Sequence, residues 1–104
     1  MSFEEYWATG LFEGEGCIYI HKTKQQAHLF VRMTDLDVLE RLQRLWGGSV
    51  KACTPAKNPT HKPAWRWALY KKAGVSNILV TILPYLSDRR ACKALDALDH
   101  LDGI

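Results

Sequence analysis

The residues best suited to chemistry gather near the N-terminus, where Glu13 and Glu15 alternate with glycines. A carboxylate at the end of a helix can hold Mg²⁺, a hard cation that prefers oxygen ligands and retains several waters. Beside a phosphodiester, such a cation polarises the phosphate, lowers the pKa of attacking water and stabilises the leaving oxygen. The two glutamates lie about 200° apart around a helix, so they cannot face the same metal. We expect Glu15 to bind the metal and Glu13 to be a structural or solvated acid.

Two glycines of the same segment, Gly10 and Gly14, lie four residues apart and so share one helical face. Glycine within a helix costs about 1 kcal/mol against alanine, which favours a packing purpose such as close approach of a second helix. The chain has no second copy of this stripe, so we expect a twofold-related subunit to supply the partner helix. The alternative is another helix of the same chain. The expected interface comprises Trp7, Gly10, Leu11 and Gly14.

A twofold pair of these helices would also bring two Glu15 carboxylates close together beside the axis. Like charges at short range repel unless a cation neutralises them. The dimer and the metal are therefore linked expectations.

The rest of the chain predicts the elements that position these residues. A helix is expected over 3–15, capped by Ser2 and Glu5. Alternation predicts strands over 17–23, 27–33, 49–53 and 65–70, with a loop over 55–63. Further helices are expected from the N-cap Thr34 to Gly47, over 75–83 before Pro84, and after the N-cap Ser87. The order α-β-β-α-β-β-α-α predicts one α+β domain over 1–104, with helices on one face of an antiparallel sheet.

That layout leaves the other face of the sheet uncovered. No strand carries an acid, because all eleven acids fall within 4–15, 35–40 and 88–102. Lysine and arginine meet phosphates, and planar or hydrogen-bonding side chains meet base edges, so this face predicts double-stranded DNA as partner. The alternative is an ordinary solvated face. The expected DNA-binding residues are Tyr19, His21, Lys24, His28, Phe30, Arg32, Lys51, Lys57, Arg66 and Tyr70.

The segment from Ala8 to Gly16 resembles the nine-residue motif that names the LAGLIDADG homing endonucleases. Gly10, Leu11 and Gly16 are identical to the motif, while Glu13 and Glu15 replace aspartates. The resemblance continues along the chain. Residues 14–18 are similar to the usual continuation, residues 33–39 with the glycine pair 47–48 are similar to the second helix and its exit, and residues 83–86 with 89–90 are similar to the closing segment.

The resemblance implies the αββαββα(α) fold and a homodimeric, site-specific, intron-associated endonuclease. Such an enzyme hydrolyses double-stranded DNA with Mg²⁺, for which Mn²⁺ or Ca²⁺ can substitute in binding. It assigns Glu15 as metal ligand and catalytic residue, with the carbonyl of Gly14 as a second ligand. A basic active-site residue is implied at Arg89, with Arg90 as the second choice.

The departures from the family pattern are the two glutamates and Met33, which stands near a position often held by a glutamine-like residue. They leave open a non-cleaving maturase or DNA-binding regulator on the same fold. A basic protein–protein adaptor is a further alternative, from another functional class.

Composition excludes several other classes. No apolar run approaches the roughly 18 residues of a membrane span, and the acidic start is unlike a secretory signal. Three widely spaced cysteines, Cys17, Cys53 and Cys92, predict free thiols rather than a zinc site. We expect a reducing compartment, either the cytoplasm of a bacterial or phage-infected cell or an organellar matrix.

Overall fold

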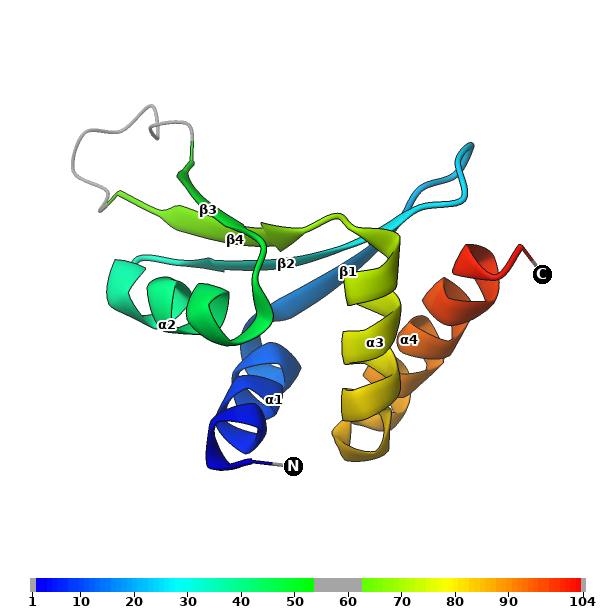
Figure 1. Ribbon diagram of the computed structural model, residues 1–104, viewed down its shortest axis with the longest axis horizontal. Coiled ribbons are helices and arrows are strands. Elements are labelled where there is room, and N and C mark those ends of the chain that lie inside the picture. Colours follow the sequence, from blue (N-terminus) through cyan, green and yellow to red (C-terminus); the bar gives the residue numbers. More distant parts are fainter. Residues whose placement is uncertain (1, 54–62, 104) are drawn as a thin grey trace.

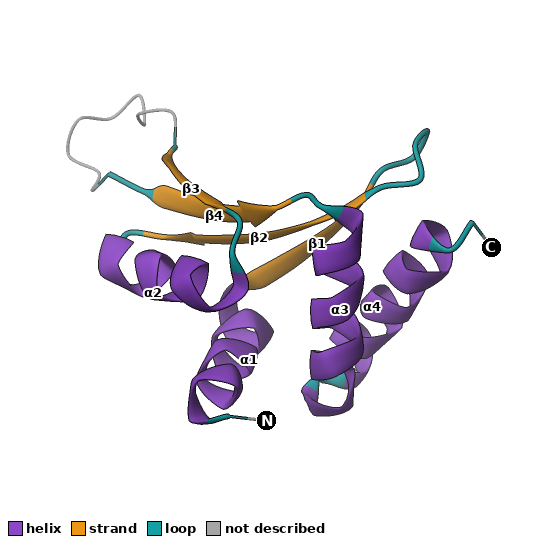
Figure 2. Ribbon diagram, in the orientation of Figure 1, coloured by secondary structure: helices purple, strands orange, loops and turns teal. Residues whose placement is uncertain are grey.

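The computed structural model describes residues 2–53 and 63–103, which form a sheet covered on one side by helices (Figure 1). This α+β arrangement confirms the expected order and class. Colouring by secondary structure shows all the helices below the sheet and its other face open (Figure 2). The elements are α1 (Phe3–Glu15), β1 (Gly16–Ile20), β2 (Ala27–Met33), α2 (Leu36–Trp46), β3 (Ser49–Ala52), β4 (Trp65–Leu69), α3 (Lys72–Ile82), the 3₁₀ turn η1 (Leu83–Tyr85) and α4 (Asp88–Leu101).

The sheet has the strand order β1-β2-β4-β3, and each neighbouring pair is antiparallel. Because side chains alternate along a strand, Leu29 and Val31 of β2 face the helices while His28 and Arg32 face away. The core between sheet and helices is apolar, and each fully buried side chain of this size contributes roughly 1.5–3 kcal/mol. Its largest members are Trp67, Phe12, Leu29, Leu39, Leu42, Leu79, Ile82 and Leu101.

Helix α1 has one buried face and one open face. Ala8, Thr9 and Phe12 are buried against the domain. On the opposite side of the helix, Phe3 is 85% exposed and Gly10 is also exposed. The predicted N-cap is confirmed, since the Ser2 hydroxyl accepts from the Glu5 N–H at 3.2 Å.

Helix α1 passes directly into β1 at Gly16, whose N–H donates to the Phe12 carbonyl. A Cβ on Gly16 would lie 2.5 Å from that carbonyl oxygen and from the Phe12 ring. Only glycine fits this junction as it stands. It fixes the place at which Glu15, the last residue of α1, meets the sheet.

Several predicted boundaries were wrong. Strand β1 ends at Ile20 rather than at residue 23, because the His21 N–H donates to the Gln26 carbonyl and closes the hairpin early. Strands β3 and β4 each end one residue earlier than expected, and α3 begins three residues earlier. The loop predicted over 55–63 lies outside the described residues except for its last position.

Two predicted caps also need correction. Asp35, not Thr34, occupies the N-cap of α2, and it makes no side-chain cap hydrogen bond. Ser87 does stand at the N-cap of α4, but its hydroxyl caps nothing. Its backbone N–H instead donates to Glu13 of α1, a contact across 74 residues. Within 2–53 and 63–103, no helix has the length and apolar character that a membrane crossing requires.

Candidate nucleic-acid interface and the end of helix α1

Four rings form a connected cluster on the open face of the sheet, here called the aromatic cluster: Tyr19, His28, Phe30 and Tyr70. The His28 ring stacks on Tyr19 at 5.9 Å and meets the Tyr70 ring edge-on at 4.6 Å. Phe30 lies 5.9 Å from Tyr70. Each ring is therefore held by another, and the cluster presents a preformed apolar and hydrogen-bonding surface.

Within this cluster, the pKa of His28 lies below its ordinary value of 6.5. Burial among the rings is the larger cause, and the nearby His21 adds to it. Neutral imidazole is thus the favoured form at neutral pH, with one ring nitrogen donating and the other accepting. Such a side chain can read a base edge without adding charge.

Three cations lie side by side across the strands β2, β4 and β3, and are here called the basic triplet: Arg32, Arg66 and Lys51. Arg32 and Lys51 are both register partners of Arg66. The Arg66 guanidinium lies 4.8 Å from the Phe30 ring centroid, within the range of a cation–π contact. The triplet lines a hollow of about 360 Å³.

The β1–β2 hairpin carries the predicted residues His21 and Lys24. Its tip is tied to the end of α4, because Gln25 Nε2 donates to the Leu101 carbonyl at 2.7 Å. His100 Nε2 donates to the Lys24 carbonyl at 2.6 Å. The two contacts join segments 76 residues apart and hold the hairpin at one end of the open face. Lys57, also predicted to bind DNA, lies outside the described residues.

The C-terminal end of α1 presents oxygen donors. Glu15 is exposed, and its carboxylate has no hydrogen bond or ion pair among the described residues. The helix ends at Glu15, so the Gly14 carbonyl lacks an intrahelical partner. A carboxylate and a carbonyl are oxygen ligands of the kind that Mg²⁺ takes. Over the described residues, no cluster of three or more His, Cys, Asp or Glu side chains could hold a metal, so one chain supplies at most part of a site.

Glu13 has the structural role that was expected of it. Its carboxylate accepts from the Ser87 N–H at 3.2 Å and lies 3.8 Å from the Arg90 guanidinium. Arg90 also donates to the Gly16 carbonyl. These contacts clamp the start of α4 to the α1–β1 junction. They engage Arg90 internally, which disfavours it as the catalytic cation.

Arg89 is exposed and lies near the same junction. It lines a hollow of about 500 Å³ together with Gly16 and Cys17 of β1. Lys93, one helical turn further along α4, lines the same hollow. The structure therefore brings three cations, Arg89, Arg90 and Lys93, beside the residue that follows Glu15, and of these Arg90 is already held by the Gly16 carbonyl. Sequence reasoning missed Lys93, although its spacing of four residues from Arg89 on a helix was a usable signal.

The predicted interface residues of α1 differ in exposure. Gly10 and Gly14 are exposed, and a Cβ on either would meet nothing within 4 Å. Trp7 and Leu11 are half-buried. The Arg41 guanidinium lies 3.9 Å from the centroid of the Trp7 ring and pairs with Glu4, whose pKa it lowers mainly by hydrogen bonding. Contacts among the described residues therefore do not explain why glycine occupies these two positions.

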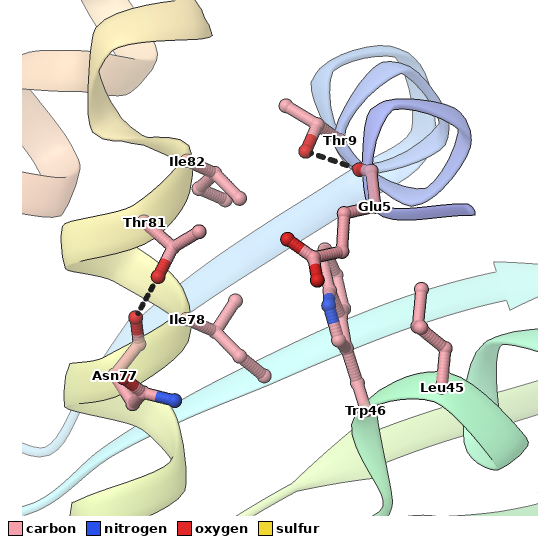
Figure 3. Close-up of a pocket in the computed structure, with 8 residues that line it drawn as sticks. All are labelled: Glu5, Thr9, Leu45, Trp46, Asn77, Ile78, Thr81 and Ile82. Atoms are coloured by element: carbon pink, nitrogen blue, oxygen red, sulfur yellow. Dashed lines mark hydrogen bonds between the residues drawn. The ribbon is translucent and has the colours of Figure 1, made fainter. Parts of the chain in front are cut away.

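A separate hollow of about 200 Å³ lies among α1, α2 and α3, on the helix side of the sheet (Figure 3). The Glu5 side chain points toward it, as do Trp46 and Asn77. Thr9 donates to the Glu5 carbonyl at 2.6 Å. The hollow lacks any basic side chain and lies away from the open face, so it is unsuited to a DNA phosphate.

Comparison with known proteins gives a match in structure. No family model and no curated protein matches the sequence. The homing endonuclease I-CvuI, in complex with a DNA target and Mg, matches with a TM-score of 0.73 at 19% identity, over 95% of this chain and 66% of that chain. The group I intron-encoded endonuclease I-CeuI, complexed with DNA, matches at 0.73 and 10% identity, over 98% and 55% of the two chains. The LAGLIDADG meganuclease I-AabMI, bound to uncleaved DNA, matches at 0.59 and 21% identity, over 84% and 31%.

The chain thus spans 66% or less of the length of these three endonucleases. At these identities the likeness establishes architecture. The four-stranded antiparallel sheet of this chain, with its helices on one face, matches these endonucleases in structure and agrees with the sequence resemblance. The chain has the fold of the LAGLIDADG homing endonucleases.

Proposed function

We propose that this chain is one subunit of a homodimeric LAGLIDADG homing endonuclease, which hydrolyses double-stranded DNA at specific sites with a divalent metal. The observation that carries the proposal is the open face of the sheet, where aromatic rings and cations lie together and the strands bear no acid. Solved proteins with this fold include several in complex with DNA.

DNA binding is proposed for the open face. Cations there and on the hairpin would neutralise phosphates and release counterions, which gives affinity that falls steeply with salt. The rings and the neutral His28 would contact base edges in the major groove.

Dimerisation is proposed through the open face of α1. A second α1 could approach closely at Gly10 and Gly14, because neither carries a side chain and, among the described residues, no atom lies within 4 Å of a Cβ placed on either. The exposed Phe3 would be covered in such a dimer. Two copies would place two Glu15 carboxylates near the twofold axis and two sheets side by side over one duplex.

Hydrolysis is proposed at the end of α1. Glu15 and the Gly14 carbonyl would hold a divalent metal, which would supply an activated water and offset charge on the phosphate. Arg89 would donate to a phosphate oxygen and stabilise negative charge as it develops. The Glu13–Arg90 clamp joins the α1–β1 junction to the start of α4, the two segments that carry Glu15 and Arg89.

The test is cleavage of a supercoiled plasmid library with randomised inserts, in Mg²⁺ and in Mg²⁺ with excess chelator. We expect linear products only with free Mg²⁺, and a shared, roughly palindromic sequence at the cut ends. Tight, salt-sensitive binding without cutting in Mg²⁺ or Mn²⁺ would instead indicate the non-cleaving maturase or regulator. Absence of salt-sensitive DNA binding would refute a DNA-binding role altogether.

A further inference from the structure

The open face divides into two chemically different halves along strand β2. Around His28 lies the aromatic cluster, and around Arg32 lies the basic triplet. Four residues separate the two centres, about 13 Å at the rise of a β-strand. Along a duplex this distance corresponds to about four base pairs at roughly 3.4 Å each. The two halves would therefore face different base pairs.

The basic triplet lies at the end of the sheet that joins α1. Gly16, the residue after Glu15, pairs with Val31, and Arg32 is the next residue of β2. From there the triplet runs across β2, β4 and β3 at strand spacings of about 4.8 Å. It spans roughly 10 Å across the sheet, at right angles to β2.

Within residues 2–53 and 63–103, no acidic side chain pairs with this triplet. Over the described residues, Arg32, Lys51 and Arg66 have no ion pair and no hydrogen bond. Like charges placed directly opposite in a sheet destabilise it, so the arrangement favours a ligand rich in acceptors. The Arg66 guanidinium lies over the Phe30 ring, and Arg66 lines the hollow of about 360 Å³ together with Arg32 and Lys51.

Guanine is the base that fits these donors. In the major groove it offers two adjacent acceptors, O6 and N7, which arginine contacts with two parallel N–H groups and lysine contacts as well. Adenine offers one acceptor and one donor, and a guanidinium has no acceptor for that donor. A flat guanidinium lying over a ring is suited to such paired contacts, whereas a lone flexible cation suits a phosphate.

We infer that the basic triplet reads guanine, so that each half-site carries guanines on the side nearer the cleavage centre. The aromatic cluster then reads base pairs about four steps further out, where apolar rings suit thymine methyl groups. This inference rests on the proposed DNA-binding function, which it makes specific.

The experiment is selection of bound duplexes from a randomised library, with Ca²⁺ to permit binding, for the wild type, Arg66→Lys and Arg66→Gln. The wild type should enrich guanine at two or three adjacent positions of each half-site. Arg66→Lys keeps the charge but replaces the planar fork with a flexible ammonium, so guanine preference at one or two of these positions should weaken by less than the roughly 5- to 150-fold that a whole bidentate pair contributes. Arg66→Gln should shift the same positions toward adenine, whose N6 and N7 match an amide.

Lys24→Gln on the hairpin is the matched control, since it removes one cation outside the triplet. It should lower affinity for all sequences alike and leave the guanine positions unchanged. The inference fails if the wild type selects no adjacent guanines. It also fails if Arg66→Gln weakens all sequences equally and reduces the salt slope by about one, which would assign the triplet to phosphates. A wild type that binds no duplex overturns the proposed function and the inference together.

Discussion

The open face of the sheet and the C-terminal end of α1 differ in how far a single chain completes them. On the sheet, the rings contact each other and Arg66 is seated on Phe30. At the end of α1, the described part of the chain gives the Glu15 carboxylate no partner and places no atom within 4 Å of a Cβ on Gly10 or Gly14.

This contrast separates two activities. A surface that is organised within one chain can bind DNA by itself, although weakly if only half of a site is contacted. A site that consists of one carboxylate and one carbonyl needs further ligands before it can hold a metal and promote hydrolysis. We therefore expect binding to persist, and cleavage to be lost, whenever the two α1 helices are separated.

The largest expected effect comes from Gly10→Leu. The added side chain fills the space proposed for the partner helix, at a cost of roughly 1–3 kcal/mol that the twofold axis repeats. The dimer should weaken by roughly 30-fold or more. Sedimentation should show a mass near the 11.9 kDa of one chain, with Mg²⁺-dependent cleavage lost.

The monomer should fold normally, because nothing within 4 Å meets a Cβ at Gly10. Glu40→Leu, an exposed change on α2, is the matched control and should leave the mass unchanged. A Gly10→Leu protein that sediments like the wild type would refute this interface.

A second effect, on folding, is expected from Gly16→Ala. The new methyl group would lie 2.5 Å from Phe12 atoms, so either the helix end or the strand must move. The free energy of unfolding should fall by roughly 1–3 kcal/mol, as measured by urea denaturation. Gly74→Ala, whose Cβ would lie 3.3 Å from the mobile end of Leu69, should change stability by less than about 1 kcal/mol. Equal effects from the two changes would show that the junction is not tight.

A smaller effect is expected at the hairpin. Gln25→Ala removes one hydrogen bond that ties the hairpin tip to α4. A bond of this kind contributes about 0.5–1.5 kcal/mol, so DNA affinity should fall by roughly 2- to 10-fold. Protection in a footprint should shrink at the outer end of each half-site, with the cleavage rate at saturation unchanged. Gln43→Ala on α2, which loses a comparable bond to the Gly48 carbonyl, should leave the footprint intact.

The smallest effect concerns pH. Burial lowers the pKa of His28 below 6.5, so the folded state favours the neutral ring. The stability that this contributes is present above pH 6.5 and is lost as the pH falls through the lower pKa of the folded state. His28→Phe keeps the ring contacts with Tyr19 and Tyr70 and removes the titration. Urea denaturation at pH 7.5 and 5.5 should show a smaller acid loss for this variant. An identical loss would locate the pH dependence elsewhere.

The order and type of the elements could be predicted from the sequence, because hydrophobic periodicity and the residues that cap or break helices are local signals. The alternation of Arg66, Trp67 and Ala68 predicted which side chains face the helices, and the glycine pair after Trp46 predicted the end of α2. The cap of α2 was misplaced because Thr34 and Asp35 are adjacent and both suit an N-cap.

The contacts that complete the site could not be read from the sequence. Ser87 was predicted to cap α4 with its side chain. Its hydroxyl makes no cap hydrogen bond, and its backbone N–H donates to the carboxylate of Glu13, 74 residues away. Arg89 and Arg90 are adjacent and of one residue type, and although the resemblance placed Arg89 first, the fold is what engages Arg90 with Gly16 and leaves Arg89 exposed. The tie between Gln25 and Leu101 likewise depends on tertiary packing.

In the proposed enzyme, the sheet binds DNA and Glu15 is a ligand of the metal. The most direct test of these two roles measures wild type and Glu15→Gln on one selected duplex, with affinity in Ca²⁺ and strand cleavage in Mg²⁺. We expect the affinity of Glu15→Gln to lie within about 3-fold of wild type, because the sheet is unchanged. Its cleavage rate should fall by roughly 100-fold or more, because a metal ligand is lost. Full Mg²⁺-dependent cleavage by Glu15→Gln would contradict the role of Glu15.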